Sequence, residues 1–159
     1  MALPQKKIYD LQEAREKIRR YCAYQERSQK QVVDKLKSYG LLPLAADELL
    51  LELIQENYLN EQRFATAFAR GRFSIKGWGK TKIANALYQH RVSKPCIMAA
   101  LAEIEDGSYS EKLMSLTQKK WNSLNGEHPN TRKQKTIRYL MGRGYLYADI
   151  EKAIQKALP

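Results

Sequence analysis

Cysteine and histidine are scarce in this chain of 159 residues, which has two of each. Cys22 and Cys96 lie far apart, and no CxxC pair or Cys/His cluster with zinc-ligand spacing occurs. His90 and His128 have no cysteine or carboxylate at ligand spacing. The sequence therefore predicts no metal site, and the two cysteines are typical of free thiols in a reducing compartment.

Long apolar runs and regular strand patterns are also missing. The longest apolar run, residues 96–102, is too short to span a bilayer, and residues 1–10 lack the apolar core of a signal peptide. No stretch shows the sustained alternation of a half-buried strand. We therefore expect an all-α protein of the cytoplasm, with no membrane contact.

Signatures of catalysis are equally sparse, and no nucleophile-elbow pattern is present. Gly79-Lys80-Thr81 matches the end of a phosphate loop, but Ser74 stands where the first glycine of GxxxxGK[ST] belongs and no strand precedes it. A helix start is the better interpretation, and its amides could still bind a phosphate or a carboxylate by donating hydrogen bonds to it. We expect a non-enzymatic protein without a cofactor.

Acidic residues are outnumbered, with 17 against 28 basic ones, which gives a net charge of +11. The distribution is uneven: residues 70–102 carry seven basic and no acidic residues, whereas residues 41–69 carry five acidic and one basic. Alternating blocks of charge predict a polyanion partner, or a partner with its own charge pattern. An ordinary solvated surface is the alternative.

Helical periodicity accounts for most of the chain after residues 1–9, which we expect to be a flexible N-terminal lead. Three capping boxes predict helix starts, at Ser28–Gln31, Ser108–Glu111 and Thr131–Gln134. Residues 126–130, which include Pro129, are predicted to form a break between two helices. The predicted helices span 10–25, 28–40, 45–57, 60–73, 80–89, 93–105, 108–124, 131–141 and 147–158.

An internal repeat relates these helices. Leu36, Leu87 and Leu140 align without a gap at intervals of 51 and 53 residues, and Gly40, Arg91 and Gly144 align in the same way. Such repetition is typical of units that stack along a line. The sequence therefore predicts three tandem three-helix repeats, at 10–57, 58–106 and 107–159, in an elongated and curved arrangement.

The candidate binding residues are basic side chains around the second helices of the last two repeats. Lys80 aligns with Lys133, and Lys82 aligns with Lys135, so repeated basic positions would form a stripe that follows a phosphate backbone. Lysines kept for solubility are the alternative. The full set is Arg70, Arg72, Lys76, Lys80, Lys82, Arg91, Arg132, Lys133, Lys135, Arg138 and Arg143.

One stretch resembles a known family. Residues 58–92 begin with YLNEQRFA, continue with Arg70, Arg72 and Lys76-Gly77, and end in an Ile-xxx-Leu helix. This arrangement resembles the middle of the RecX family, regulators of the RecA recombinase, and the likeness extends from about Arg15 to the C-terminus. Arg91 stands where the family has a turn glycine, so we expect that helix end to close differently.

The resemblance implies a regulator that binds the RecA filament on single-stranded DNA, and we expect the chain to be a monomer. It would inhibit the ATPase, strand-exchange and coprotease activities of RecA, and so act in DNA repair, recombination and the SOS response. From the residues alone, two alternatives stay open. One is an autonomous DNA- or RNA-binding protein that uses its basic second helices, and the other is a protein-binding scaffold that uses the acidic helix at 47–56.

Overall fold

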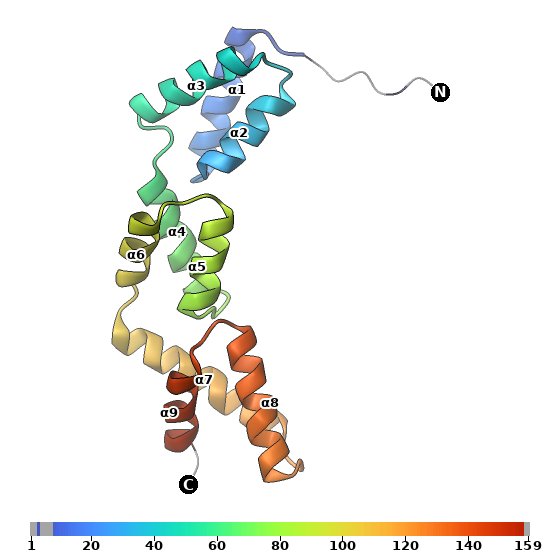
Figure 1. Cartoon of the computed structure of the whole chain (residues 1–159), viewed down its shortest axis with the longest axis vertical. Coiled ribbons are helices and arrows are strands. Elements are labelled where there is room, and N and C mark those ends of the chain that lie inside the picture. Colours follow the sequence, from blue (N-terminus) through green and yellow to red (C-terminus); the bar gives the residue numbers. More distant parts are fainter. Residues whose placement is uncertain (1–2, 4–7, 158–159) are drawn as a thin grey trace.

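The protein is a column of helices. The computed structural model describes residues 3 and 8–157, and this part contains nine helices and no strand. They follow one another along an elongated, gently curved body with the N-terminal helices at one end and α9 at the other (Figure 1). The predicted all-α repeat fold is confirmed. The helices are α1 (Leu11–Tyr24), α2 (Gln29–Ser38), α3 (Pro43–Gln55), α4 (Glu61–Ser74), α5 (Lys80–Gln89), α6 (Lys94–Ala102), α7 (Asp106–Ser123), α8 (Pro129–Gly142) and α9 (Tyr147–Ala157).

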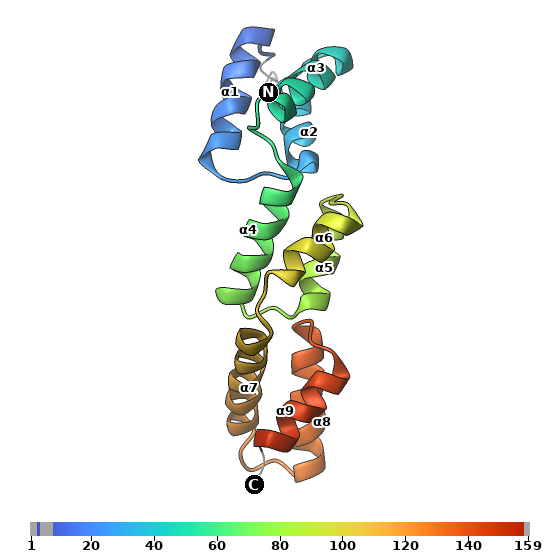
Figure 2. The same ribbon diagram turned by 90° about the vertical axis from the view of Figure 1, so that its left-hand side faces the viewer.

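Three hydrophobic clusters lie along the column. The first is formed by α1–α3, the second by α4–α6 and the third by α7–α9, and these triplets succeed one another in both views (Figures 1 and 2). Tyr109 packs against both the second and the third cluster. The domain boundaries at 57/58 and 106/107 stay a prediction, and residues 1–2 and 4–7 of the predicted lead lie outside the described residues.

The repeat seen in the sequence corresponds to equivalent buried positions. Leu36, Leu87 and Leu140 come from the second helix of each triplet and are at most 1% exposed. Each packs in a different cluster, so the same position completes each of the three cores. Burial of a leucine side chain stabilises each unit by roughly 1.5–3 kcal/mol.

The turn after each second helix is also repeated. Gly40, Arg91 and Gly144 have φ values of 78°, 61° and 98°, which place all three in the left-handed region. The amide of Arg91 donates to the Tyr88 carbonyl at 2.9 Å, as the amide of Gly144 donates to the Met141 carbonyl at 3.0 Å. The expectation that Arg91 closes its helix differently is therefore wrong: the arginine adopts the conformation of the glycines at a steric cost.

The predicted helix starts are only partly correct. The capping box of Ser28 and Gln31 is present in full. The box predicted at Ser108 is not used, because α7 begins at Asp106 and the Tyr109 amide already donates to the Glu105 carbonyl at 2.9 Å. Ser108 therefore lies in the first turn of the helix rather than before it.

The helix start predicted at Thr131 is also wrong. Pro129, which we expected to break the chain, is the first residue of α8, and the side chain of His128 accepts a hydrogen bond from the Asn130 amide at 3.2 Å. Proline suits this position because its φ is already helical and its missing N–H would have no helical acceptor. Helix α8 consequently has an additional half turn at its start.

Side chains hold the first and second triplets together. The Arg63 guanidinium donates to the Glu26 carboxylate at 2.8 Å. His90 lies with its ring 5.2 Å from that of Phe64, and its Nδ1 is 3.2 Å from Ser28 Oγ.

None of the helices described combines the length and hydrophobicity needed to cross a bilayer.

Candidate nucleic-acid interface

The second helices of the three triplets succeed one another along the same side of the body. Figures 1 and 2 both show α2, α5 and α8 in this order. Lys80 and Lys82 lie at the start of α5, which meets the turn after α8, whereas Lys133 and Lys135 lie in the first half of α8. Seven residues of α8 follow Lys135, so about 10 Å of helix separates the two lysine pairs.

The amides at the start of α5 are occupied by protein groups. The Gly79 amide donates to the Arg143 carbonyl at 2.7 Å, and the Thr81 amide donates to the Gly144 carbonyl at 3.1 Å. The Lys80 amide donates to the hydroxyl of Tyr109 at 2.9 Å. The expectation that these amides could bind a phosphate or a carboxylate is therefore wrong.

Two of the candidate arginines are engaged by the fold, Arg143 at the junction between the second and third triplets and Arg72 within the second triplet. The Arg143 guanidinium donates to the carbonyl of Lys76. The Arg72 guanidinium lies 4.5 Å from the Phe68 ring centroid and 5.3 Å from that of Trp78. A cation held against aromatic rings contributes to packing as well as to charge, so neither group is fully available to a ligand.

Arg132 serves a similar structural purpose within the third triplet. Its Nε donates to the Trp121 carbonyl at 2.9 Å, and its guanidinium lies 4.2 Å from the Trp121 ring centroid. These contacts fasten α8 to the end of α7. Arg132 therefore belongs to the fold more than to the exposed basic surface.

Lys80 and Lys82 are half-buried against aromatic rings. The ammonium of Lys80 lies 5.0 Å from the Tyr109 ring centroid, and that of Lys82 lies 4.6 Å from the Trp78 ring centroid. Lys135, which aligns with Lys82, instead pairs with Glu127 at 2.6 Å. The aligned lysines thus have different surroundings: Lys80 and Lys82 are half-buried, whereas Lys133 and Lys135 are exposed.

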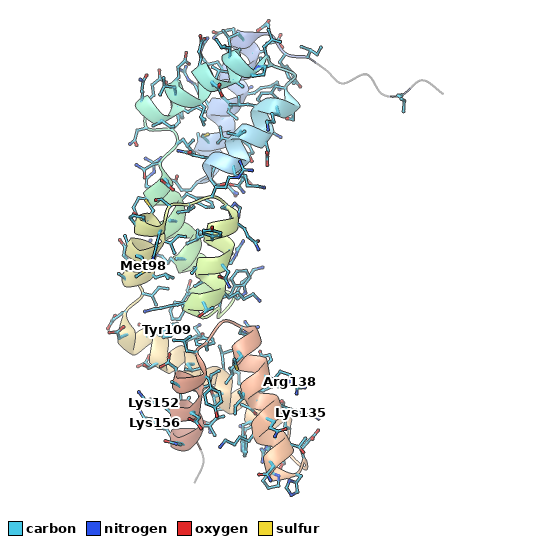
Figure 3. All side chains as sticks on the ribbon, in the orientation of Figure 1. Met98, Tyr109, Lys135, Arg138, Lys152 and Lys156 are labelled. Carbon is cyan, nitrogen blue, oxygen red and sulfur yellow. The ribbon has the colours of Figure 1, made fainter. Side chains whose placement is uncertain are left out.

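Four of the candidates are exposed and, within the described residues, make no ion pair: Lys76, Arg91, Lys133 and Arg138. Arg70 is exposed but pairs with Glu103 at 3.6 Å. Figure 3 places Arg138 and Lys135 on the side of the third triplet that carries α8. The exposed part of α8 is therefore the most accessible basic surface in the candidate set.

The sequence analysis missed a groove of mixed charge. It has a volume of about 430 Å³, lies between α7 and α9, and is lined by Lys80, Lys152 and Lys156 together with Asp106 and Asp149. Figure 3 shows Lys152 and Lys156 on the side opposite Lys135 and Arg138. The spacing of four residues between the two lysines places them on one side of a helix and could have indicated this groove. Asp149 and Glu151 lie in the same segment, so its net charge did not mark it as basic.

Comparison with known proteins gives consistent results. Family models described as the second and third three-helix domains of RecX match residues 60–101 and 108–154. A regulatory protein RecX of Clostridium botulinum is 31% identical over 134 residues, which cover 83% of this chain and 62% of the relative. One of Serratia proteamaculans is 32% identical over 112 residues, which cover 69% of this chain and 63% of the relative. The chain thus matches about three fifths of the length of these relatives.

Solved structures show the same fold. The crystal structure of RecX from Lactobacillus salivarius has a TM-score of 0.84 at 24% identity and covers 93% of this chain and 96% of its own. Another crystal structure, of a regulatory protein RecX, has a TM-score of 0.84 at 20% identity and covers 91% of this chain and 71% of its own. These two likenesses concern the fold. The two matched domain models, which account for more than half of the residues, establish that the chain belongs to the RecX family.

Proposed function

We propose that this chain is a non-enzymatic regulator that binds the RecA–DNA filament and inhibits the ATPase, strand-exchange and coprotease activities of RecA. The observation that carries the proposal is an elongated, three-triplet body with exposed basic side chains along the line of α5 and α8, in a member of the RecX family. A long body can contact several neighbouring subunits of a helical polymer at once. Its exposed cations suit the phosphates and acidic surfaces of such a filament.

The basic surface supports a modest affinity for bare DNA. Three candidate arginines are engaged in the fold, and the amides at the start of α5 are occupied. About four exposed cations are left to neutralise phosphates, which corresponds to a log–log salt slope of about −3 to −4. Such a surface supplements contacts with a protein partner rather than replacing them.

An autonomous DNA- or RNA-binding protein is the second candidate, because α8 exposes Lys133 and Arg138 on one helix that could enter a groove. This candidate function requires tight binding of the chain to bare duplex in the absence of RecA. With about six phosphates neutralised, its salt slope would be about −5. The dependence of binding on salt and on RecA therefore separates the two candidates.

A pair of matched variants tests the proposal. Lys133→Ala/Arg138→Ala removes two charges from α8, and Lys152→Ala/Lys156→Ala removes two charges from α9. Figure 3 shows Arg138 on the side of the third triplet opposite Lys152 and Lys156. Binding to RecA filaments on fluorescently labelled single-stranded DNA should weaken by about tenfold for the first and by less than about threefold for the second, since only the first removes proposed phosphate contacts. Equal losses would refute the assignment of α8 as the filament-facing surface.

A further inference from the structure

Helix α3 exposes far more apolar surface than its packing requires. Leu49 and Leu53 bury its inner side in the first cluster. Four large aliphatic residues on or next to α3 are exposed, and we call them the leucine face: Leu42 at 77%, Leu44 at 74%, Leu51 at 55% and Ile54 at 40%. Since the first cluster is completed without them, the fold gives no reason for apolar residues at these positions.

The leucine face is continuous along the helix. Leu44 and Leu51 are seven residues apart, which places them on one side of α3, and Ile54 follows one turn later. Leu49 lies about 140° around the helix from Leu44, so the exposed and buried leucines occupy different sides. A spacing of this kind suits the anchor residues of a second helix laid alongside the first.

Carboxylates accompany the leucine face. Asp47 and Glu48 lie between Leu44 and Leu51, are exposed and, in the described part of the chain, form no ion pair. The other two acidic residues of this segment are already engaged with α1. Glu52 pairs with Arg15 at 2.9 Å, and Glu56 pairs with Arg19 at 2.7 Å.

The corresponding helices of the other triplets lack this combination. Helix α6 exposes Met98 beside the basic Lys94, and the exposed residues of α9 include Lys152 and Lys156. Residues 41–57 contain four acidic and no basic residues, within a chain whose net charge is +11. Leu146 beside the start of α9 is exposed as well, but the carboxylates of α9 are accompanied by lysines, so exposed leucines among carboxylates without a neighbouring cation in the same segment are particular to α3.

The chemistry of this surface identifies its partner. Carboxylates repel the phosphates of nucleic acid and of anionic lipid, so neither fits the leucine face. A helix with leucines on one side and lysines or arginines beside them fits both features, because its apolar side would cover the leucine face while its cations pair with Asp47 and Glu48. We infer that the outer side of α3 binds a basic, amphipathic helical segment of a protein partner.

This surface lies apart from the basic surface of the third triplet. Figures 1 and 2 place α3 and α8 at opposite ends of the body. The chain can therefore engage a basic protein segment at one end while α8 contacts a polyanion at the other. Binding of a protein segment at α3 does not depend on which polyanion α8 contacts, and it does not require RecA.

Binding of a designed peptide tests the inference. The probe is a fluorescein-labelled, 18-residue helical peptide of leucine and lysine, and its counterpart replaces lysine with glutamate; fluorescence anisotropy reports binding to the whole chain. The net charge of +11 disfavours a basic peptide on most of the surface, so we expect micromolar binding of the leucine–lysine peptide at α3.

Two variants address the two features of the leucine face separately. Leu44→Gln/Leu51→Gln should weaken the peptide at least about tenfold by removing its apolar anchors. Asp47→Lys/Glu48→Lys should weaken it similarly and should raise the affinity for the leucine–glutamate peptide above that of the parent, which simple loss of structure would not do. Glu13→Lys/Glu16→Lys makes the same charge change on α1 and should leave the affinity within about threefold of the parent.

The inference is overturned if the parent chain fails to bind the leucine–lysine peptide, or if the α3 variants bind it as the parent does. All these substitutions are at exposed positions, so the helical circular dichroism of each variant should match that of the parent. The experiment contains no RecA. Failure of the chain to inhibit RecA would consequently refute the proposed function without affecting the result for α3.

Discussion

Gly79 and Gly144 lie directly against each other where α5 meets the turn after α8: a Cβ on Gly79 would come within 2.3 Å of the Gly144 carbonyl oxygen. Any larger residue at position 79 must push the second and third triplets apart. We expect Gly79→Ala to lower the free energy of unfolding by about 1–3 kcal/mol, measured by urea denaturation.

Gly71 provides a matched control, because it lies inside α4 and a Cβ there would meet no atom within 4 Å. Gly71→Ala should raise the stability by about 0.5–1 kcal/mol, since alanine favours a helix interior. A Gly79→Ala variant as stable as the parent would show that the contact between the two glycines does not constrain the junction.

Tyr145 reinforces the same junction through a buried hydrogen bond. Its hydroxyl donates to the Gly77 carbonyl at 3.0 Å, across 68 positions of the sequence. Tyr145→Phe leaves that carbonyl without its donor and should lower the free energy of unfolding by about 1–3 kcal/mol. Tyr88→Phe removes a hydroxyl from a side chain that is 76% exposed and should change little. Equal urea midpoints for the two variants would contradict this account.

Acidification should weaken the contact between the first two triplets. Burial of His90, with smaller contributions from the charges of Lys30 and Arg72, lowers its pKa below the ordinary value of 6.5. Because the unfolded chain takes up this proton at higher pH, the folded state should be most stable above pH 6.5 and lose stability as the pH falls below it towards the lowered pKa.

Urea denaturation of the parent and of His90→Gln between about pH 5.5 and 7.5 measures this effect, in a range where most carboxylates stay ionised. The parent should lose stability on acidification, and the variant should show a smaller slope. A stability that rises on acidification, or an unchanged slope in His90→Gln, would rule out the role of this histidine.

The two thiols should differ in reactivity. Burial raises the pKa of Cys22 to about 11, whereas Cys96 is only half-buried. Because the thiolate is the nucleophile, iodoacetamide at about pH 8 should modify Cys96 at least about tenfold faster in the folded protein. Mass spectrometry of timed digests measures both rates, and unfolding in guanidinium should equalise them. Faster modification of Cys22 in the folded state would contradict its burial.

The sequence predicts the repeat well because the repeat depends on local signals. Burial of Leu36, Leu87 and Leu140 follows from helical periodicity, and both ends of α5 match the predicted residues 80–89. Competing local signals cause the errors. A cap contributes only about 1 kcal/mol to helix stability, so Pro129 together with the His128 cap determines the start of α8 in place of the capping box at Thr131. Helix α3 likewise begins at a proline, Pro43, rather than at the predicted residue 45.

The candidate site is harder to predict because the roles of its side chains depend on distant residues. Arg143 donates to a carbonyl 67 residues away, and Arg132 stacks on Trp121 from the preceding helix. The local sequence does not distinguish these partly buried arginines from Arg138, which is exposed. Charge patterns therefore locate the basic segments, while tertiary packing decides which cations are accessible.

The most direct measurement is the DNA-dependent ATPase of the cognate RecA on single-stranded DNA, titrated with this chain and paired with binding of the chain to the same DNA alone. The proposal predicts inhibition at chain concentrations well below that of RecA, together with weak binding to bare DNA and a salt slope no steeper than about −4. An undiminished ATPase, together with tight and salt-sensitive binding to bare DNA, would contradict the proposal and favour the autonomous nucleic-acid-binding protein.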